Sequence, residues 1–305
     1  MRRYIINRIL QSIPILFGVT LIAFFILRLT GDPAQLILGE MAEPEVLEAY
    51  REEHGLNDPV LVQYVRFIQN IFRGDFGFSL RYQEPVLPLF VDRIPSTIEL
   101  ALTALSIGIV VGIPIGIFSA VYRNTWWDIL TRAIVMLGQA VPGFYLGLLL
   151  IIVFSVELRL LPTGGRGGLE RLIMPSLALS TYLVTMIVRF TRATVLDVLS
   201  QDYVRTARAK GLKEKVVLFR HVLKNALIPL TTIIGLQIAG LFSGSIVTET
   251  IFAWPGVGRF TVQAIYSRDF PTVQAIILIM ASVIIFINLI VDILYSYLDP
   301  RIRFA

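Results

Sequence analysis

Long runs of apolar residues, separated by short polar stretches, extend over most of the chain. A helix needs roughly 20 mainly apolar residues to cross a membrane. Six runs are of about that length, and none alternates apolar with polar residues as a barrel strand would. The pattern therefore predicts an all-α membrane protein with six transmembrane helices. The predicted spans are Ile9 to Leu29, Leu100 to Val121, Ala133 to Val156, Ile173 to Phe190, Ala226 to Val247 and Val273 to Leu294.

The first run has a second interpretation, because the basic residues Arg2, Arg3 and Arg8 precede or begin it as they would in a secretory signal. The run is longer than the usual apolar core of a signal, which has about 7–15 residues, and no Ala-x-Ala cleavage site follows it. We therefore interpret residues 1–30 as an N-terminal end followed by the first span.

Basic residues near the span ends predict the orientation, since they tend to remain in the cytoplasm. The N-terminal arginines, Arg123 after the second span and Arg301 and Arg303 at the C-terminus all place both termini in the cytoplasm. The segment 191–225, between the fourth and fifth spans, is the most basic loop and is predicted to be cytoplasmic as well. Its basic residues are Arg192, Arg205, Arg208, Lys210, Lys213, Lys215, Arg220 and Lys224.

The segment 31–97 then lies outside and carries helix signals of its own. Pro44 begins one candidate helix and Gly55 ends it. An apolar stripe at helical spacing follows Pro59 and stops at Gly74. We predict a small external helical segment, which either packs on the span ends or docks a partner, followed by a core of five spans in residues 98–305.

Composition agrees with a membrane protein. Hydrophobic residues make up 55% of the chain and charged residues 16%, and the mean hydropathy is +0.74, beyond what a water-soluble domain usually carries. The net charge of +5 is explained by the cytoplasmic loops, so nucleic-acid binding is not expected. Because the chain has no cysteine, disulfides and thiolate metal sites are excluded.

The search for catalytic or cofactor-binding residues finds none. No Gly-x-x-x-x-Gly-Lys-Ser/Thr loop is present to hold nucleotide phosphates. The two histidines, His54 and His221, fall on opposite sides of the predicted membrane, which rules out a shared metal site. We expect a chain that is not an enzyme and that binds no cofactor or metal.

Small and polar residues inside the spans give weaker signals. Gly108, Gly112 and Gly116 recur at intervals of four, which favours close helix packing over a gating role. Gln237 and Asn288 are central polar residues that could line a path, but their sequence context favours a bond to a neighbouring helix. Pro114 and Pro142 are expected to kink their helices. Charged residues near span ends are expected to be mostly interfacial anchors, and they are Glu99, Asp128, Arg132, Glu157, Arg189 and Asp292.

The basic loop contains a compact helix signal. An acidic residue, Asp202, suits a helix N-terminus, Arg208 and Lys210 suit a C-terminus, and Gly211 supplies a stop. The signal predicts a short rigid helix that projects into the cytoplasm.

At this loop the sequence resembles the permease subunits of binding-protein-dependent ABC importers, whose loop has a Glu-Ala-Ala, three residues, Gly pattern. Arg205, Thr206 and Ala207 stand at the triplet and Gly211 at the glycine. The resemblance narrows to the dipeptide, oligopeptide, nickel and glutathione branch through five motifs in the family's order. They are Gly31-Asp-Pro-Ala34, Gly74-Asp-Phe-Gly77, Asp202 to Gly211, Glu249-Thr-Ile-Phe-Ala-Trp-Pro-Gly256 and Asp299-Pro-Arg-Ile-Arg303.

The resemblance implies the partners and the site. A second homologous permease would complete the pathway in a bacterial or archaeal inner membrane. Two ATP-binding cassette subunits would use ATP and Mg²⁺, and an external solute-binding protein would deliver the solute. By resemblance, the ATPase-coupling residues are Asp202, Tyr203, Arg205, Thr206, Ala207, Arg208, Ala209, Lys210 and Gly211.

A secondary transporter would more often show inverted repeats and ionisable residues within the membrane, and an intramembrane enzyme would need a buried nucleophile or metal set. Neither pattern is evident.

Overall fold

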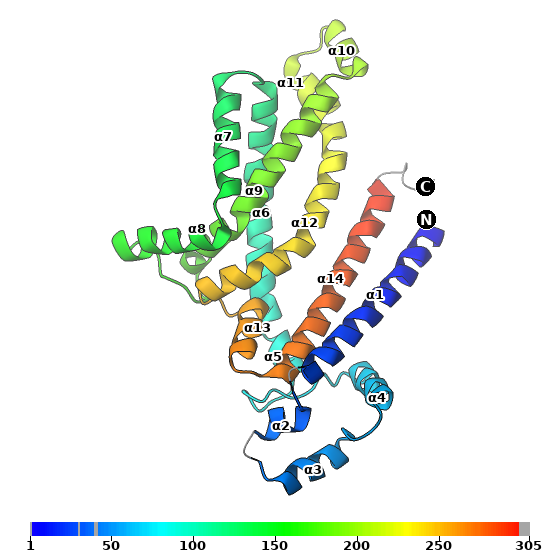
Figure 1. Cartoon of the computed structure of the whole chain (residues 1–305). Coiled ribbons are helices and arrows are strands. Elements are labelled where there is room, and N and C mark those ends of the chain that lie inside the picture. The colour runs from blue at the N-terminus through cyan, green and yellow to red at the C-terminus, as the bar shows by residue number, and fades with distance from the viewer. Residues whose placement is uncertain (1, 30, 40–41, 299–305) are drawn as a thin grey trace. The chain divides into compact units, whose positions relative to one another are not determined.

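The computed structural model describes residues 2–29, 31–39 and 42–298, and helices dominate them (Figure 1). Within these ranges no β-strand forms; Phe78 and Pro85 make an isolated bridge. The predicted all-α fold class is confirmed. The C-terminal motif Asp299 to Arg303, with its two arginines, lies outside the described residues.

The helices follow one another along the chain, and most connections are short; the longer ones are residues 73–85 and 158–168. They are α1 (Arg2–Leu29), α2 (Pro33–Leu38), α3 (Pro44–Glu53), α4 (Val60–Phe72), α5 (Val86–Val91), α6 (Ile94–Val121), α7 (Trp126–Ala140), α8 (Gly143–Leu150), the π-helix η1 (Ile151–Glu157), α9 (Leu169–Leu199), α10 (Asp202–Ala209), α11 (Glu214–Val216), the π-helix η2 (Val217–Leu223), α12 (Lys224–Ile251), α13 (Val257–Tyr266) and α14 (Phe270–Leu298).

Four stretches of helix in the described part of the chain are long and apolar enough to cross a membrane. They are Ile6–Phe25, Val86–Val121, Leu169–Leu199 and Phe270–Val291. Two bent pairs, Trp126–Ala140 with Gly143–Glu157 and Glu214–Leu227 with Pro229–Phe242, pass the same test together. The described residues therefore hold four to six spans.

The third predicted span is not one helix, so the prediction of a continuous helix from Ala133 to Val156 was wrong. The two halves meet at an angle of 96°. Val141 is extended, as the residue before a proline tends to be, and Pro142 is the N-cap of the next helix. The kink predicted at Pro142 is thus a complete break. Pro114, in contrast, lies within the continuous helix α6.

The chain divides into two compact units, which we describe separately. The first consists of residues 1–95 and 259–289. Here the two predicted external helices form as α3 and α4, with Gly55 and Gly74 at positive φ after them. The ring of Tyr64 packs on Phe24 of α1 at 5.3 Å between centroids, and its hydroxyl lies 2.7 Å from Thr20 Oγ1. The helix α4 is therefore held against α1.

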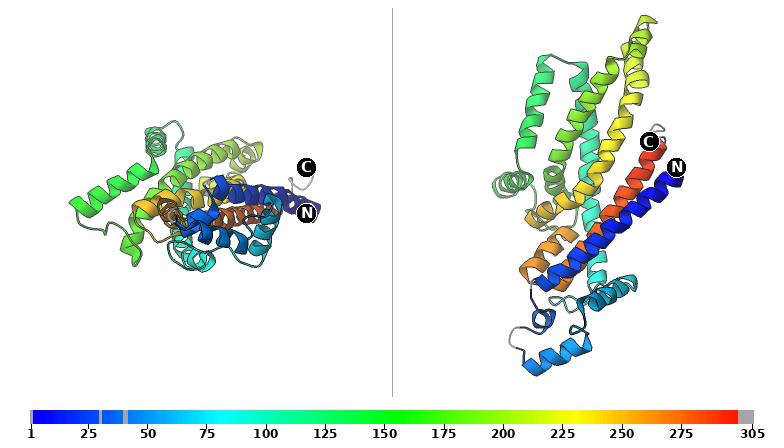
Figure 2. Two further views of the ribbon diagram at one scale, coloured as in Figure 1. Left: turned by 60° about the horizontal axis from the view of Figure 1, so that its bottom comes forward. Right: turned by 45° about the vertical axis from the view of Figure 1, so that its right-hand side comes forward.

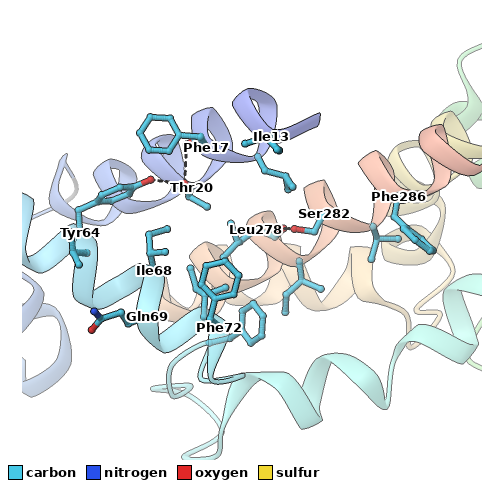
Figure 3. Close-up of a pocket in the computed structure, with 16 residues that line it drawn as sticks. Ile13, Phe17, Thr20, Tyr64, Ile68, Gln69, Phe72, Leu278, Ser282 and Phe286 are labelled. Carbon is cyan, nitrogen blue, oxygen red and sulfur yellow. Dashed lines mark hydrogen bonds between the residues drawn. The ribbon is translucent and has the colours of Figure 1, made fainter. Parts of the chain in front are cut away.

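An apolar cavity of about 910 Å³ lies in this unit between α1, α4 and α14 (Figure 3). Its walls include Phe17, Ile68, Phe72, Leu278 and Phe286. Part of the apolar stripe that predicted α4 thus lines this cavity.

The second unit consists of residues 96–258 and 290–305, and in it α6, α9 and α12 run side by side (Figures 1 and 2). The glycines of α6 allow α9 to approach closely. A Cβ atom on Gly112 would lie 2.8 Å from Ile187 Cγ2, and one on Gly116 would lie 2.5 Å from Thr191 Cβ. The predicted packing role of these glycines is confirmed.

Candidate coupling site

The short helix of the basic loop is α10, and it begins at Asp202 as predicted. Its first turn is acidic, Arg208 lies in its last turn, and Gly211 takes a φ of +75° just beyond it. Arg208 Nη2 donates to Glu214 Oε1 at 2.6 Å. This bond raises the pKa of Arg208, so the guanidinium stays charged and ties the end of α10 to the returning chain.

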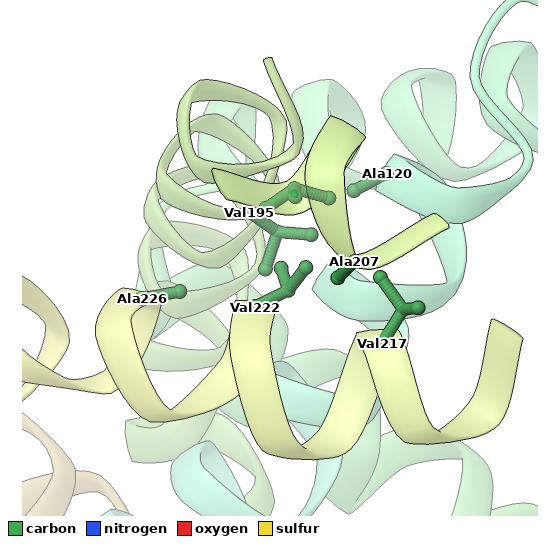
Figure 4. Close-up of a cluster of buried hydrophobic side chains, with 7 residues drawn as sticks. Ala120, Val195, Ala207, Val217, Val222 and Ala226 are labelled. Carbon is green, nitrogen blue, oxygen red and sulfur yellow. The ribbon is translucent and has the colours of Figure 1, made fainter. Parts of the chain in front are cut away.

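Two residues of α10 are buried in a hydrophobic cluster that we call the platform (Figure 4). Val204 is 0% exposed and Ala207 is 6% exposed. The other members of the platform come from α6, α9, η2 and α12, which fixes α10 on the ends of the long helices of its unit. They are Ala120, Val195, Val217, Val222 and Ala226.

The opposite face of α10 is polar and exposed. The side chains of Asp202 and Arg205 are 95% and 76% exposed, and their charged groups lie 3.6 Å apart. Tyr203 and Thr206 are also exposed. Of the residues predicted to couple to an ATPase, only Ala207 faces the platform, and the others are exposed. The predicted coupling residues therefore comprise Ala207, which helps to anchor α10, and eight exposed residues, and their coupling role stays a prediction.

A buried ion pair stabilises the helices near the platform. Asp128, at the start of α7, is fully buried and accepts two bonds from Arg192 of α9, at 2.8 and 2.9 Å. Ser119 Oγ and the backbone N–H of Asn124 also donate to this carboxylate, at 2.7 and 3.1 Å. These hydrogen bonds of Asp128 are all made within the protein, whereas the charged residues near span ends were expected to be mostly interfacial anchors. Sequence reasoning assigned Arg192 only to the basic loop.

The other charged residues expected near span ends differ in their exposure and in their bonding partners. Glu99 pairs with Arg166 at 2.7 Å with both side chains partly exposed, and Arg189 donates to Gln139 at 2.8 Å. Glu157 is exposed. The side chain of Asp292 lies outside the described part of the structure.

The motif Glu249 to Gly256 builds a second buried cluster that the sequence alone did not explain. Glu249 is 0% exposed, and its carboxylate accepts a bond of 2.7 Å from Thr97 Oγ1. Trp254 Nε1 donates to the carbonyl of Ser96 at 2.8 Å. A Cβ atom on Gly256 would lie 2.4 Å from the Glu249 carboxylate, so a larger residue there would have to displace this buried group. The cluster joins the end of α12 to the start of α6. In the sequence, the only indication of this cluster was the motif Glu249 to Gly256.

Two further motifs each contain an aspartate that accepts a hydrogen bond from a backbone N–H two residues further on. Asp32 caps α2 by accepting a bond from the backbone N–H of Ala34 at 3.1 Å. Asp75 accepts from the N–H of Gly77 at 2.9 Å. These aspartates therefore shape turns in residues 31–97.

The two candidate pathway residues belong to different units. Gln237 lies near the middle of α12, is half-buried and lines a hollow of about 350 Å³ in the second unit. Asn288 is half-buried in the first-unit part of α14. Among the described residues, neither side chain bonds a neighbouring helix, which was the interpretation that the sequence favoured.

Comparison with known families decides the class of protein. The family described as binding-protein-dependent transport system inner membrane component matches residues 112–304, and the model of its N-terminal part matches residues 1–101. The chain belongs to this family. As such an inner membrane component, it is the permease subunit of an ABC importer, and the resemblance seen in the sequence is confirmed.

Relatives of this inner membrane component match it over their whole length. The glutathione transport system permease protein GsiC of Escherichia coli is 45% identical over 305 residues, covering 100% of both chains. The dipeptide transport system permease protein DppB of Alkalihalophilus pseudofirmus is 40% identical over 333 residues, again with full coverage of both.

Solved structures support the fold of this family member. A structure described as inward facing conformations of the MetNI methionine ABC transporter matches with a TM-score of 0.61 and 18% identity, over 70% of this chain and 97% of the other. An amino acid ABC transporter matches with a TM-score of 0.51 and 16% identity, over 70% and 94% of the two chains. Helices of this chain therefore follow the arrangement of ABC permeases.

Proposed function

We propose that this permease forms one half of a translocation pathway and that a paralogous permease forms the other half. Two ATP-binding cassette subunits bind and hydrolyse ATP with Mg²⁺, and an external solute-binding protein delivers the solute. The chain itself holds no cofactor, contacts lipid around its spans and binds no nucleic acid. Its N- and C-termini and α10 face the cytoplasm, as the positions of the basic residues favour.

The proposed solute is glutathione or a dipeptide. This assignment is supported by two relatives that match end to end and carry those solutes in their names. Oligopeptides and nickel, which related permeases also serve, are the alternatives that an uptake measurement tests. With the complete importer in vesicles, we expect ATP-dependent uptake of labelled dipeptide or glutathione; uptake of Ni²⁺ alone would contradict the assignment.

The observation that carries the coupling role is the division of α10 into two faces. Val204 and Ala207 anchor it to the platform while a polar face is left exposed. A helix of eight residues would be marginal by itself in water, so the platform is what makes it rigid. A rigid projection can pass a movement of the ATPases to α9 and η2, which both contribute residues to the platform.

The absence of cysteine allows a direct test of this contact. Thr206→Cys places one thiol on the exposed face of α10, and Val204→Cys places one in the platform. In the assembled importer, a short bifunctional maleimide is expected to cross-link Thr206→Cys to an ATPase subunit. The buried control should give little product. Equal cross-linking from both positions, or none from Thr206→Cys, would argue against α10 as the contact.

The end of α10 provides a milder test through Gly211→Val. A Cβ atom here would meet nothing within 4 Å, so the substitution costs only backbone strain, about 1–2 kcal/mol at a positive φ. We expect normal insertion and assembly but reduced uptake for each ATP hydrolysed. Gly211→Asn is the control, because asparagine tolerates this conformation. A Val variant that couples as well as the Asn variant would show that the angle of α10 is not critical.

A further inference from the structure

We infer that the hollow on α8, α9 and α12 is a solute-contacting wall of the pathway, and that it recognises the uncharged amide groups of the solute. This inference rests on the proposed function. It concerns one surface of the second unit, whose polar members are Tyr182, Gln237 and Thr248.

The hollow exists because small residues surround it. Gly143 begins α8 next to the break at Pro142, and a Cβ atom added there would meet nothing within 4 Å. A Cβ atom added at Gly240 would have only Gln237 Oε1 within 4 Å, at 4.0 Å. The resulting space of about 350 Å³ is in the range of small-molecule sites.

Its position argues against simple contact with lipid. Gln237 is the fourteenth of the 28 residues of α12, so its side chain lies near the middle of the helix. Within the described residues its amide bonds no neighbouring helix, and an amide left without partners in hydrocarbon is costly. A position facing water and solute removes that cost. The remaining wall is apolar, with Phe144, Leu179 and Leu183.

The chemistry of the lining indicates the class of solute. The described residues around the hollow include no Asp, Glu, His, Lys or Arg. A metal ion therefore has no carboxylate or imidazole ligand here, and an ionised group has no counter-charge. The Gln237 amide can donate and accept, and the Tyr182 and Thr248 hydroxyls can do both. Such groups match peptide bonds, which each present one N–H and one C=O.

Single cysteines test whether this wall meets water and solute. In the complete importer in nanodiscs, Gly240→Cys is expected to react with a charged, water-soluble methanethiosulfonate reagent. Val110→Cys is the control, because Val110 is an exposed apolar residue of α6 outside the hollow. We expect the control to react at least tenfold more slowly. Alanylalanine and S-methylglutathione, which lack a free thiol, should slow the labelling of Gly240→Cys in the presence of the binding protein.

The outcomes separate this inference from the proposed function. If the charged reagent labels both positions at the same rate, or fails to label Gly240→Cys, the wall does not face the pathway, whatever the solute. Labelling that neither peptide slows would overturn the contact with solute. If the wild-type importer takes up neither peptide while labelling is fast, the proposed solute is wrong but the access of water is supported.

A kinetic measurement tests recognition by the amide. Gln237→Leu retains much of the volume but removes the hydrogen bonds, so KM for peptide uptake should rise roughly three- to tenfold if one bond to the solute is lost. Gln237→Asn, which keeps the amide, should recover part of the affinity. An unchanged KM in the Leu variant would refute recognition through Gln237.

Discussion

Replacing Ala207 with aspartate is expected to release α10 from the platform and abolish solute uptake. Ala207 is 6% exposed and packed among apolar side chains, so a carboxylate there would lose its water without gaining a partner. The cost is on the order of several kcal/mol per buried ion. Because α10 is only eight residues long, we expect it to detach locally while the spans stay folded.

Hydrogen exchange of α10 and co-purification of the ATPase subunits measure this release. The matched control is Ala209→Asp, two residues further along, where the side chain is exposed and the new charge stays in water. The control should retain the protection of α10 seen in the wild type. If Ala207→Asp keeps both that protection and full uptake, the platform is not what holds the helix.

Replacing Asp128 with alanine is the second change with a large expected effect. The substitution would leave the guanidinium of Arg192 without its bidentate partner at a site where Asp128 is fully buried. Removing one member of a buried pair typically costs about 3–5 kcal/mol. We expect a clear fall in the Tm of the purified chain in detergent and loosening of the α6–α7 turn from α9.

The exposed pair between Glu99 and Arg166 offers a control of the same chemistry. Glu99→Ala should cost no more than about 1 kcal/mol, because a solvent-exposed pair contributes little. Combining Asp128→Leu with Arg192→Leu should recover most of the loss, since no unpaired charge is then buried. Equal destabilisation by Asp128→Ala and Glu99→Ala would show that burial of the Asp128 pair adds nothing.

Features set by a few neighbouring residues were predictable from the sequence, and α10 is the best instance. Its acidic start, basic end and glycine stop all act within one or two turns, and the observed bounds agree with them. The third span shows the opposite case. Its apolar residues continue through Val141 and Pro142, so hydropathy alone could not distinguish a complete break from a kink.

Residues whose role depends on distant partners were not predictable in this way. Asp128 and Arg192 are 64 positions apart, and only the fold brings them together. Glu249 meets Thr97 across 152 positions. In both cases the sequence showed a charged residue near the end of a span but gave no information on what would surround it. The division of the chain at residues 30 and 97 stays a prediction.

The glycines of α6 have a consequence for how this permease can move. Gly108, Gly112 and Gly116 repeat along the helix every four residues, or about 6 Å, and each receives a side chain of α9. If α9 moved along α6 by less than this repeat, Ile187 or Thr191 would meet residues that have a Cβ atom. This packing opposes sliding of α6 along α9, so we expect the two helices to keep their register while the permease transports solute.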